Sequence, residues 1–314
     1  MQPLRHISSV ALASRFSVTG SGSAAAKNKI NPLDLIKLTP LMRLTSGRAD
    51  TRIALIDGPV ATHHRDLSGA NIQQIPGLPG TCELASLACL HGTFVAGILC
   101  ARRGSQAPAI CPACTLLVRP IFAEASSRVF QMPSATPQEL AKAIFDSIDA
   151  GAHIINLSAA LSQPSSKGER HLEESLDRAA HRGVIVVVAA GNQGTVGSSA
   201  ITRHPWVIPV IACDRRGRPI SYSNVGNSIG RRGLSAPGEG ITSLAFDGQL
   251  PSFGGTSAAA PFVTGALALL RSMFPNATAA ALRLAITGAS GPRRATVVPP
   301  LLNAWAAYQS LLRT

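Results

Sequence analysis

The stretch Gly254-Gly255-Thr256-Ser257-Ala258-Ala259-Ala260-Pro261 surrounds one hydroxyl group with small residues and leads into the apolar run from Phe262 to Leu270. The small neighbours allow a substrate backbone to approach Ser257, and the apolar run predicts a buried helix. Pro261 is expected in its first turn, where N–H groups lack intrahelical partners. Free N–H groups and the helix dipole near Ser257 then favour the negative charge of an attacked carbonyl. Taken alone, the stretch also fits the N-cap of an ordinary core helix.

The composition is typical of a tightly packed α/β protein. The chain has 314 residues, of which 46% are hydrophobic and only 4% aromatic, so it is long enough to bury one large core. Abundant small aliphatic residues are typical of fully buried strands. We expect a flexible N-terminal arm at residues 1–30, a short docking segment at residues 31–50 and one main domain at residues 51–314.

The charge of the chain is strongly positive, with 29 Lys and Arg against 16 Asp and Glu and a formal net charge of +13. Such a surface attracts acidic partners. The basic residues are scattered and no aromatic residues interleave with them, which argues against nucleic-acid binding. No apolar run reaches the ~18 residues of a membrane span. The N-terminal residues match a secretory signal poorly, which favours the cytoplasm, with secretion as the alternative.

The six cysteines are compatible with several states. Cys111-Pro-Ala-Cys114 fits half of a zinc site, a redox pair or a local disulfide, but no second Cys-x-x-Cys or His-x-x-x-His pair completes a zinc site. A chain of this length does not need disulfides for stability. We therefore expect structural thiols or one loop disulfide among Cys82, Cys89, Cys100, Cys111, Cys114 and Cys213.

Apolar runs alternate with helical patterns along the chain. This alternation predicts right-handed crossovers and a parallel sheet covered by helices on both faces. The expected strands are residues 53–56, 115–118, 153–157, 184–189, 206–212 and 241–245. The expected helices are residues 32–44, a helix opening at 91, then 137–150, 169–182, the run after Pro261 and 301–312.

Four polar residues stand at turns or helix starts, each in a segment that contains glycine: Asp57, His91, Asn192 and Ser257. Each has an ordinary explanation, since Asp-Gly-Pro makes a good turn, a histidine can cap a helix and Asn is common beside glycine. Together they supply an acid, a base, an oxyanion donor and a nucleophile. The set therefore predicts nucleophilic catalysis by Ser257.

Four segments resemble the signature blocks of the subtilisin-like serine proteases, namely residues 53–58, 91–97, 186–192 and 255–261. The linking segments 64–67 and 154–158 are similar to the family as well, and the match covers roughly residues 50–290. The chain order Asp, His, Ser is that of the subtilisins. The resemblance implies a three-layer α/β/α peptidase domain with a mostly parallel central sheet.

The resemblance also implies roles for individual residues. Asp57 would orient His91, which would take the proton of Ser257 and deliver it to the leaving amine. Asn192 and the backbone N–H of Ser257 would hold the oxyanion. The strand Ser158-Ala159-Ala160 would pair with the substrate backbone, and Ala189-Ala190-Gly191 would form one wall of the pocket for the residue before the cut. No cofactor is expected, and the sparse acidic residues predict no metal site.

A looser resemblance, to the proteases that mature cyanobactin-type ribosomal peptides, is carried by residues 57–59, 107–111 and 117–122. It implies processing of a precursor peptide whose acidic leader the basic surface would attract. Only 33 residues separate Asp57 from His91, which leaves no room for the helices that cyanobactin macrocyclases insert. Hydrolysis is therefore expected. The alternatives are a transpeptidase or macrocyclase, and a non-catalytic pseudoprotease that binds peptides.

Overall fold

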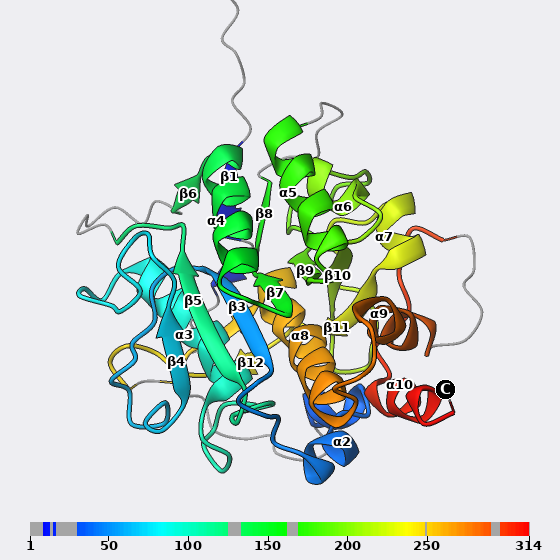
Figure 1. The fold of residues 1–314 in the computed structure, drawn as a ribbon, viewed down its shortest axis with the longest axis horizontal. Coiled ribbons are helices and arrows are strands. Elements are labelled where there is room, and N and C mark those ends of the chain that lie inside the picture. Colours follow the sequence, from blue (N-terminus) through cyan, green and yellow to red (C-terminus); the bar gives the residue numbers. More distant parts are fainter. Residues whose placement is uncertain are drawn as a thin grey trace, which may run out of the picture.

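The computed structural model describes residues 9–12, 15–16, 30–124, 133–161, 169–248, 250–289 and 296–313. Its centre is a seven-stranded sheet with the strand order β11-β10-β9-β7-β3-β5-β4, in which all neighbouring strands are parallel (Figure 1). The strands are β3 (Arg52–Asp57), β4 (Asn71–Gln74), β5 (Thr115–Pro120), β7 (Ile154–Leu157), β9 (Ile185–Ala189), β10 (Ile208–Cys213) and β11 (Leu234–Pro237). The predicted parallel sheet is confirmed.

Helices cover both faces of this sheet, as the alternation of side chains along β3 shows. Ile53 and Leu55 belong to one buried cluster, whereas Ala54 and Ile56 belong to another on the opposite face. The first face packs against α2 (Thr39–Leu44), α3 (Leu87–Cys100), α8 (Thr256–Met273), α9 (Ala279–Gly288) and α10 (Ala304–Leu311). The second packs against α4 (Pro137–Asp149), α5 (Arg170–His181) and α6 (Ala200–Arg203). The fold is therefore the predicted three-layer α/β/α architecture.

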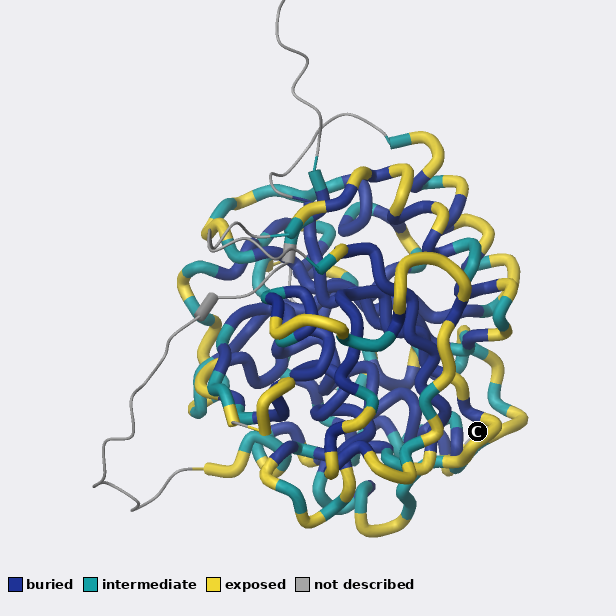
Figure 2. The backbone as a smooth tube through the Cα atoms, turned by 90° about the vertical axis from the view of Figure 1, so that its left-hand side faces the viewer, coloured by how far each residue is buried: buried dark blue, intermediate teal, exposed yellow. Residues whose placement is uncertain are grey.

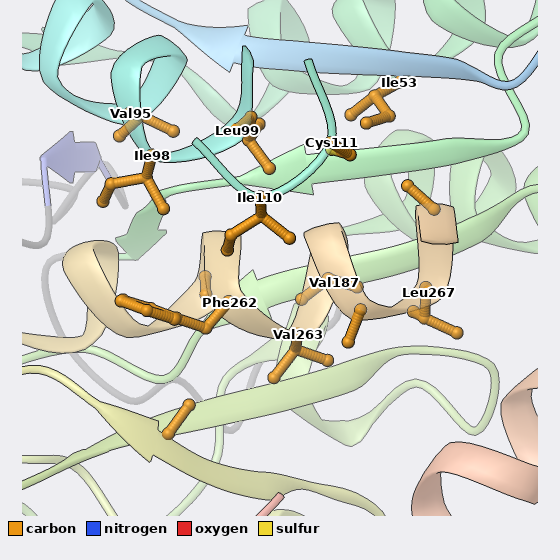
Figure 3. Close-up of a cluster of buried hydrophobic side chains, with 14 of the residues drawn as sticks. Ile53, Val95, Ile98, Leu99, Ile110, Cys111, Val187, Phe262, Val263 and Leu267 are labelled. Atoms are coloured by element: carbon orange, nitrogen blue, oxygen red, sulfur yellow. The ribbon is translucent and has the colours of Figure 1, made fainter. Parts of the chain in front are cut away.

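The contact between α3 and α8 forms the centre of the first face. Figure 3 shows Ile98 and Leu99 of α3 facing Phe262 and Val263 of α8, with Ile110 between the two helices. All five side chains are at most 1% exposed. Buried residues fill the interior of the molecule, and exposed residues follow the peripheral loops (Figure 2). This packing fixes the starts of α3 and α8 relative to each other.

Both α3 and α8 begin at an earlier residue than the sequence predicted. α3 starts at Leu87, where the Ser86 side chain accepts a hydrogen bond from the backbone N–H of Cys89, so His91 lies in the second turn and not at the helix start. α8 starts at Thr256, which places Pro261 inside the helix beyond its first turn. Pro261 has no N–H to donate to the carbonyl of Ser257. The Ser158 hydroxyl donates to that carbonyl instead, at 3.1 Å.

The predicted docking segment, residues 31–50, forms two short helices, α1 (Pro32–Leu35) and α2, instead of one. Lys37, between them, has a positive φ of 55°, which breaks the helical path. Ile36, Leu38 and Leu41 are fully buried in the same cluster as α3 and α8. These contacts join the segment to the main core.

Most of the predicted N-terminal arm, residues 1–30, lies outside the described residues. Its described parts are two strands, β1 (Val10–Leu12) and β2 (Arg15–Phe16), and both pair with the main domain. β1 lies between β6 (Ser134–Ala135) and β8 (Ala159–Leu161). β2 pairs with β13 (Ser252–Gly254), which also pairs with β12 (Ile241–Thr242).

Within the described part of the chain, no helix has both the length and the apolar character that crossing a lipid bilayer requires.

Candidate active site

Asp57 and His91 form a buried pair at the carboxyl edge of the sheet, where functional groups of parallel α/β proteins gather. Asp57 is the last residue of β3, and its Oδ1 lies 2.7 Å from Nδ1 of His91. The backbone N–H of Gly58 donates to the same oxygen at 2.7 Å. Both side chains are fully buried. The carboxylate therefore holds the imidazole ring in one orientation.

Two glycines allow α3 to approach the end of β3 this closely. A Cβ atom at Gly58 would collide with the carbonyl oxygen of Ala88, and one at Gly92 would collide with the carbonyl oxygen of Pro59. Backbone therefore packs on backbone directly beside His91. The Asp-Gly and His-Gly pairs in the sequence are the signal of this close approach.

The other ring nitrogen of His91 is positioned to act as a base. An ionised carboxylate only accepts hydrogen bonds, so Nδ1 of His91 donates its proton to Asp57. An imidazole ring whose single N–H is at Nδ1 presents a lone pair at Nε2. This atom is buried and makes no hydrogen bond to any residue that the structure describes. It is available to accept a proton from a nucleophile or substrate.

Asn192 is tied to the start of α8, one residue before Ser257. The backbone N–H of Thr256 donates to Oδ1 of Asn192 at 3.0 Å, and the backbone N–H of Gly191 donates to the Thr256 hydroxyl at 3.1 Å. Because the amide oxygen faces Thr256, the amide NH₂ group of Asn192 points away from that contact. Gly191 has a φ of 103°, which a residue with a side chain rarely adopts. The turn therefore holds Asn192 against the residue that precedes Ser257.

Ser257 itself is the second residue of α8 and is fully buried. A chain of buried hydrogen bonds holds its backbone. The Thr264 hydroxyl donates to Oδ1 of Asn156 at 2.7 Å, and Nδ2 of Asn156 donates to the Ser158 hydroxyl at 2.8 Å. Ser158 in turn donates to the carbonyl of Ser257. These bonds join β7 and the residue before β8 to α8.

Asn156, Thr264 and Asn224 were not predicted as site residues. Asn156 could have been found as a polar residue within the apolar strand Ile154–Leu157. Asn224 accepts from the backbone N–H groups of Gln193 and Thr195 and donates to the carbonyl of Ala190. It thereby supports the turn that carries Asn192, but its place in a loop provides no sequence signal.

The remaining predicted residues belong to β8 and to the end of β9 with the turn that follows it. Ala159 and Ala160 belong to β8, and both are buried. Ala189 ends β9, and Ala190 and Gly191 continue directly into the Asn192 turn. The structure brings Asp57 to His91, and it ties Asn192 and Ser158 to the start of α8. Within the described residues Nε2 of His91 makes no hydrogen bond to Ser257. Free enzymes often tighten such contacts only when substrate binds.

The six cysteines form one disulfide and four buried thiols. Cys82 and Cys89 are bonded, whereas Cys100, Cys111, Cys114 and Cys213 are free. Burial raises the pKa of Cys100 to about 12 and that of Cys213 to about 11, so these thiols are unreactive. Among the described residues, one group of three possible metal ligands occurs, Cys82, Cys89 and Glu124, and its two sulfurs are bonded to each other.

The disulfide is expected to contribute about 2 kcal/mol to the free energy of unfolding, because it closes a short loop. Denaturant titration with and without dithiothreitol measures this contribution, and the Ser257→Ala variant avoids self-digestion during the measurement. A Cys82→Ser variant is the control, because reductant then has no disulfide to break. An equal shift in this control would show that reductant acts elsewhere.

Residues 48–299, well over half of the chain, match the model of the subtilase family. The chain belongs to the subtilase family. A thermostable alkaline protease of Halalkalibacterium halodurans is 31% identical over 72% of this chain. The match spans 58% of that relative's length, less than two thirds. The family and the fold expected from the four sequence blocks are confirmed.

Two solved structures resemble this subtilase closely. The protease domain of PatA superimposes with a TM-score of 0.78 at 30% identity, covering 85% of this chain and 97% of PatA's domain. The prenylagaramide maturation protease PagA superimposes with a TM-score of 0.76 at 26% identity, covering 87% of this chain and 98% of PagA. The looser resemblance to peptide maturation proteases is thereby confirmed as a structural similarity.

Proposed function

We propose that this protein is a serine endopeptidase that hydrolyses peptide bonds with Ser257 as nucleophile, His91 as base and Asp57 as the residue that orients the base. The observation that carries the proposal is the buried 2.7 Å contact between Asp57 and His91, which leaves Nε2 of His91 without a hydrogen-bond partner in the described chain. Membership of the subtilase family supports the same assignment.

The proposed reaction begins when the Ser257 hydroxyl attacks the scissile carbonyl and its proton passes to Nε2 of His91. Asp57 stabilises the imidazolium ion that forms. Asn192 and the backbone N–H of Ser257 donate to the oxyanion. The C–N bond then breaks, and His91 gives its proton to the leaving amine. Water hydrolyses the acyl-enzyme by the same steps, with His91 taking a proton from the water and returning it to Ser257.

The substrate backbone is proposed to pair with β8 as an added strand. Ala159 and Ala160 keep side chains small at this strand, so a peptide can lie flat against it. Ala189, Ala190 and Gly191 would form one wall of the pocket for the residue before the cut. All three residues of β8 are buried, and one edge of β8 pairs with β1.

Labelling by a fluorophosphonate probe tests the nucleophile directly. The folded protein is expected to form one covalent adduct on the peptide that contains Ser257, which mass spectrometry locates. A folded protein that remains unlabelled after its N-terminal residues have been removed would instead be a peptide-binding pseudoprotease.

Asn192→Ala is expected to lower kcat by about 10²–10³, because one of the two oxyanion donors is lost. The measurement is kcat and KM on one peptide, and the fall should appear in kcat while KM changes little. Asn192 also accepts from the Thr256 N–H, so Asn192→Asp is the matched variant that retains the acceptor without the donor. Nearly full activity in Asn192→Asp would contradict the donor role.

The substrate is proposed to be a ribosomally made precursor peptide. The similarity to PagA, a prenylagaramide maturation protease, supports this class of substrate. Hydrolysis adds one water to the products, whereas capture of the acyl-enzyme by an amine gives a cyclic product without it. Mass spectrometry of the product therefore distinguishes an endopeptidase from a macrocyclase.

Salt is expected to weaken the cleavage of a precursor with an acidic leader more than that of a neutral short peptide. The net charge of +13 attracts an acidic segment at low ionic strength, and the Debye length falls from ~10 Å at 0.1 M to ~3 Å at 1 M. The measurement is kcat/KM for both substrates at both salt concentrations. Equal losses for the two substrates would rule out recruitment by charge.

Two cellular locations are proposed for the protein. The sequence predicts the cytoplasm, and secretion is the alternative. The Cys82–Cys89 disulfide is typical of oxidising compartments and supports secretion. Cell fractionation followed by thiol labelling of the isolated protein tests the location. Recovery from the cytoplasm with Cys82 and Cys89 reduced would support the first prediction.

A further inference from the structure

The disulfide between Cys82 and Cys89 reaches the helix that carries His91. Cys89 is the third residue of α3 and precedes His91 by two positions, while Cys82 lies five residues before the helix starts. Cys89 is fully buried, whereas Cys82 is partly exposed. The bond therefore ties the first turn of α3 to the chain segment that leads into it.

Hydrogen bonds tie the segment around Cys82 to the turn that follows Asp57. The backbone N–H of Val60 donates to the carbonyl of Gly80 at 2.9 Å, and the backbone N–H of Cys82 donates to the carbonyl of Val60 at 3.2 Å. Val60 is fully buried and follows Asp57 by three residues. The segment that carries Cys82 is thus paired with the chain that leaves Asp57.

The disulfide thereby closes a connection between the two members of the Asp57–His91 pair. From Asp57 the connection follows the backbone to Val60 and crosses hydrogen bonds to Cys82. It then passes through the two sulfurs to Cys89 and along α3 to His91. The contact that this connection secures joins Oδ1 of Asp57 to Nδ1 of His91 at 2.7 Å. A displacement of α3 by about 1 Å would break it, and an error of that size in a catalytic group can cost ~10²-fold in rate.

The Thr93 hydroxyl lies between the two sulfurs and the chain after Asp57. The backbone N–H of Ala61 donates to this hydroxyl at 2.9 Å. Its oxygen lies 3.8 Å from Sγ of Cys82 and 3.9 Å from Sγ of Cys89, and Thr93 is fully buried. Separation of the sulfurs therefore changes the packing around a second contact between α3 and the chain after β3.

Glu124 holds the loop between the two cysteines from the outside. Its carboxylate accepts from the backbone N–H groups of Glu83 and Leu84, at 2.7 and 3.1 Å. It also accepts from the hydroxyl of Ser86, the N-cap of α3, at 3.0 Å. The loop is thus fixed to the chain that follows β5. Loss of the disulfide is therefore expected to let the first turn of α3 shift without unfolding the loop.

We propose that the Cys82–Cys89 disulfide is a positioning element for His91, and that a dithiol reductant slows peptide cleavage by breaking it. The inference rests on the proposed function, because it requires His91 to act as the base. A thiolate of the reductant attacks the partly exposed sulfur of Cys82 and displaces the thiolate of Cys89. The second thiol of the reductant then closes on its own sulfur and releases Cys82. Two electrons and two protons pass to the protein, which gains two thiols, and the reductant becomes a disulfide.

The test measures kcat and KM on one peptide for the oxidised protein, after reduction by dithiothreitol and after reoxidation by oxidised glutathione. Reduction is expected to lower kcat by about tenfold or more with little change in KM, because it displaces the base and not β8. Reoxidation should restore kcat. Alkylation with mass spectrometry verifies the reduction, and thermal unfolding verifies the fold. A folded, fully reduced protein with unchanged kcat, or a change confined to KM, would overturn the proposal.

Cys82→Ser separates the disulfide from other effects of the reductant. This variant is expected to have the low kcat of the reduced wild type and to respond neither to dithiothreitol nor to oxidised glutathione. Cys213→Ser is the matched control, because it removes a free thiol and retains the disulfide. Its kcat should fall on reduction as the wild type's does. A Cys82→Ser variant with the kcat of the oxidised wild type would overturn the proposal.

Proton NMR reports on the Asp57–His91 contact independently of turnover. In Ser257→Ala, the downfield resonance of the Nδ1 proton of His91 is expected in the oxidised protein. Reduction should broaden or remove this resonance, because the imidazole ring no longer keeps one position against the carboxylate. A resonance that reduction leaves unchanged would contradict the positioning role.

Glu124→Gln tests the same loop with the disulfide intact, so it decides the matter even where the reduced protein unfolds. The glutamine NH₂ group cannot accept the hydrogen bonds that one carboxylate oxygen accepts. The kcat of the oxidised protein is expected to fall about threefold with little change in KM. Glu83→Gln is the matched control, because Glu83 is an exposed carboxylate in the same loop. Equal kcat values in the two variants would contradict a connection between this loop and His91.

The failure of this inference differs from a failure of the proposed function. Fluorophosphonate labelling of the oxidised and the reduced protein at equal rates would overturn the inference and leave Ser257 as the nucleophile. A folded protein that is labelled in neither state would overturn both.

Discussion

Replacing Ser257 by alanine is expected to lower kcat by about 10⁶, the loss that follows removal of the nucleophile in subtilisin. The reason is that Thr256 carries the one other hydroxyl at the start of α8, and it is not expected to replace that of Ser257. Thr256, its neighbour, is already engaged by the Gly191 N–H. The remaining rate should come from direct attack of water on the peptide bond, assisted by substrate binding and oxyanion stabilisation.

The measurement is single-turnover cleavage of a fluorogenic peptide at saturating enzyme, beside thermal unfolding of the same preparation. Ser272→Ala is the matched control: Ser272 lies on the same helix, is 6% exposed and donates to the carbonyl of Ala268. It should change activity by less than about twofold. A Ser257→Ala enzyme that retains a hundredth of the wild-type rate would contradict the assignment of the nucleophile.

Replacing Asp57 by asparagine is expected to lower kcat by about 10⁴ without unfolding the protein. The asparagine Oδ1 can still accept from the Gly58 N–H, which keeps the turn after β3 in place. Its NH₂ group, however, donates to Nδ1 of His91. The ring proton then moves to Nε2, which can no longer accept a proton from Ser257.

Peptide cleavage and one-dimensional proton NMR of the imidazole N–H check this prediction together. The downfield resonance of a carboxylate-bound Nδ1 proton should be lost in Asp57→Asn. Asp66→Asn is the control. Asp66 is 7% exposed, and its replacement by asparagine removes the same charge at a position away from His91. A loss of less than tenfold in Asp57→Asn would mean that the Asp57–His91 contact has only a structural role.

The sheet was predictable wherever a strand is apolar on both faces, and less so elsewhere. β3, β5, β7, β9 and β10 stand out as apolar runs because helices cover both faces of the sheet. β4 was missed because Asn71–Gln74 is a polar edge strand with little burial. β11 was missed because it is only four residues long and contains a proline, Pro237. α9 was missed because apolar residues also lie on its exposed face, where Leu284 is 72% exposed. Its apolar residues therefore do not follow a clear helical period.

The sequence was sufficient to propose candidate site residues, but not to predict the contacts that hold them in place. Asp57, His91 and Asn192 each lie beside a glycine, and Ser257 follows Gly255 by two residues, so each segment can be recognised in the sequence. The hydrogen bonds among Thr264, Asn156 and Ser158 join residues up to 108 positions apart, as in the contact from Thr264 to Asn156. Only the folded chain brings them together. The same holds for β1, whose partner strand lies about 150 residues further along.

The separation of about 200 residues between Asp57 and Ser257 has a consequence for biosynthesis. Asp57 leaves the ribosome about 200 residues before Ser257, a delay of roughly 10–40 s at ~5–20 residues per second. Late in this interval the nascent chain carries the proposed base and its orienting carboxylate without the proposed nucleophile. On the proposed mechanism, proteolytic capacity therefore arises only after α8 has been made and packed against α3. Unfinished chains on the same polysome therefore do not cleave one another.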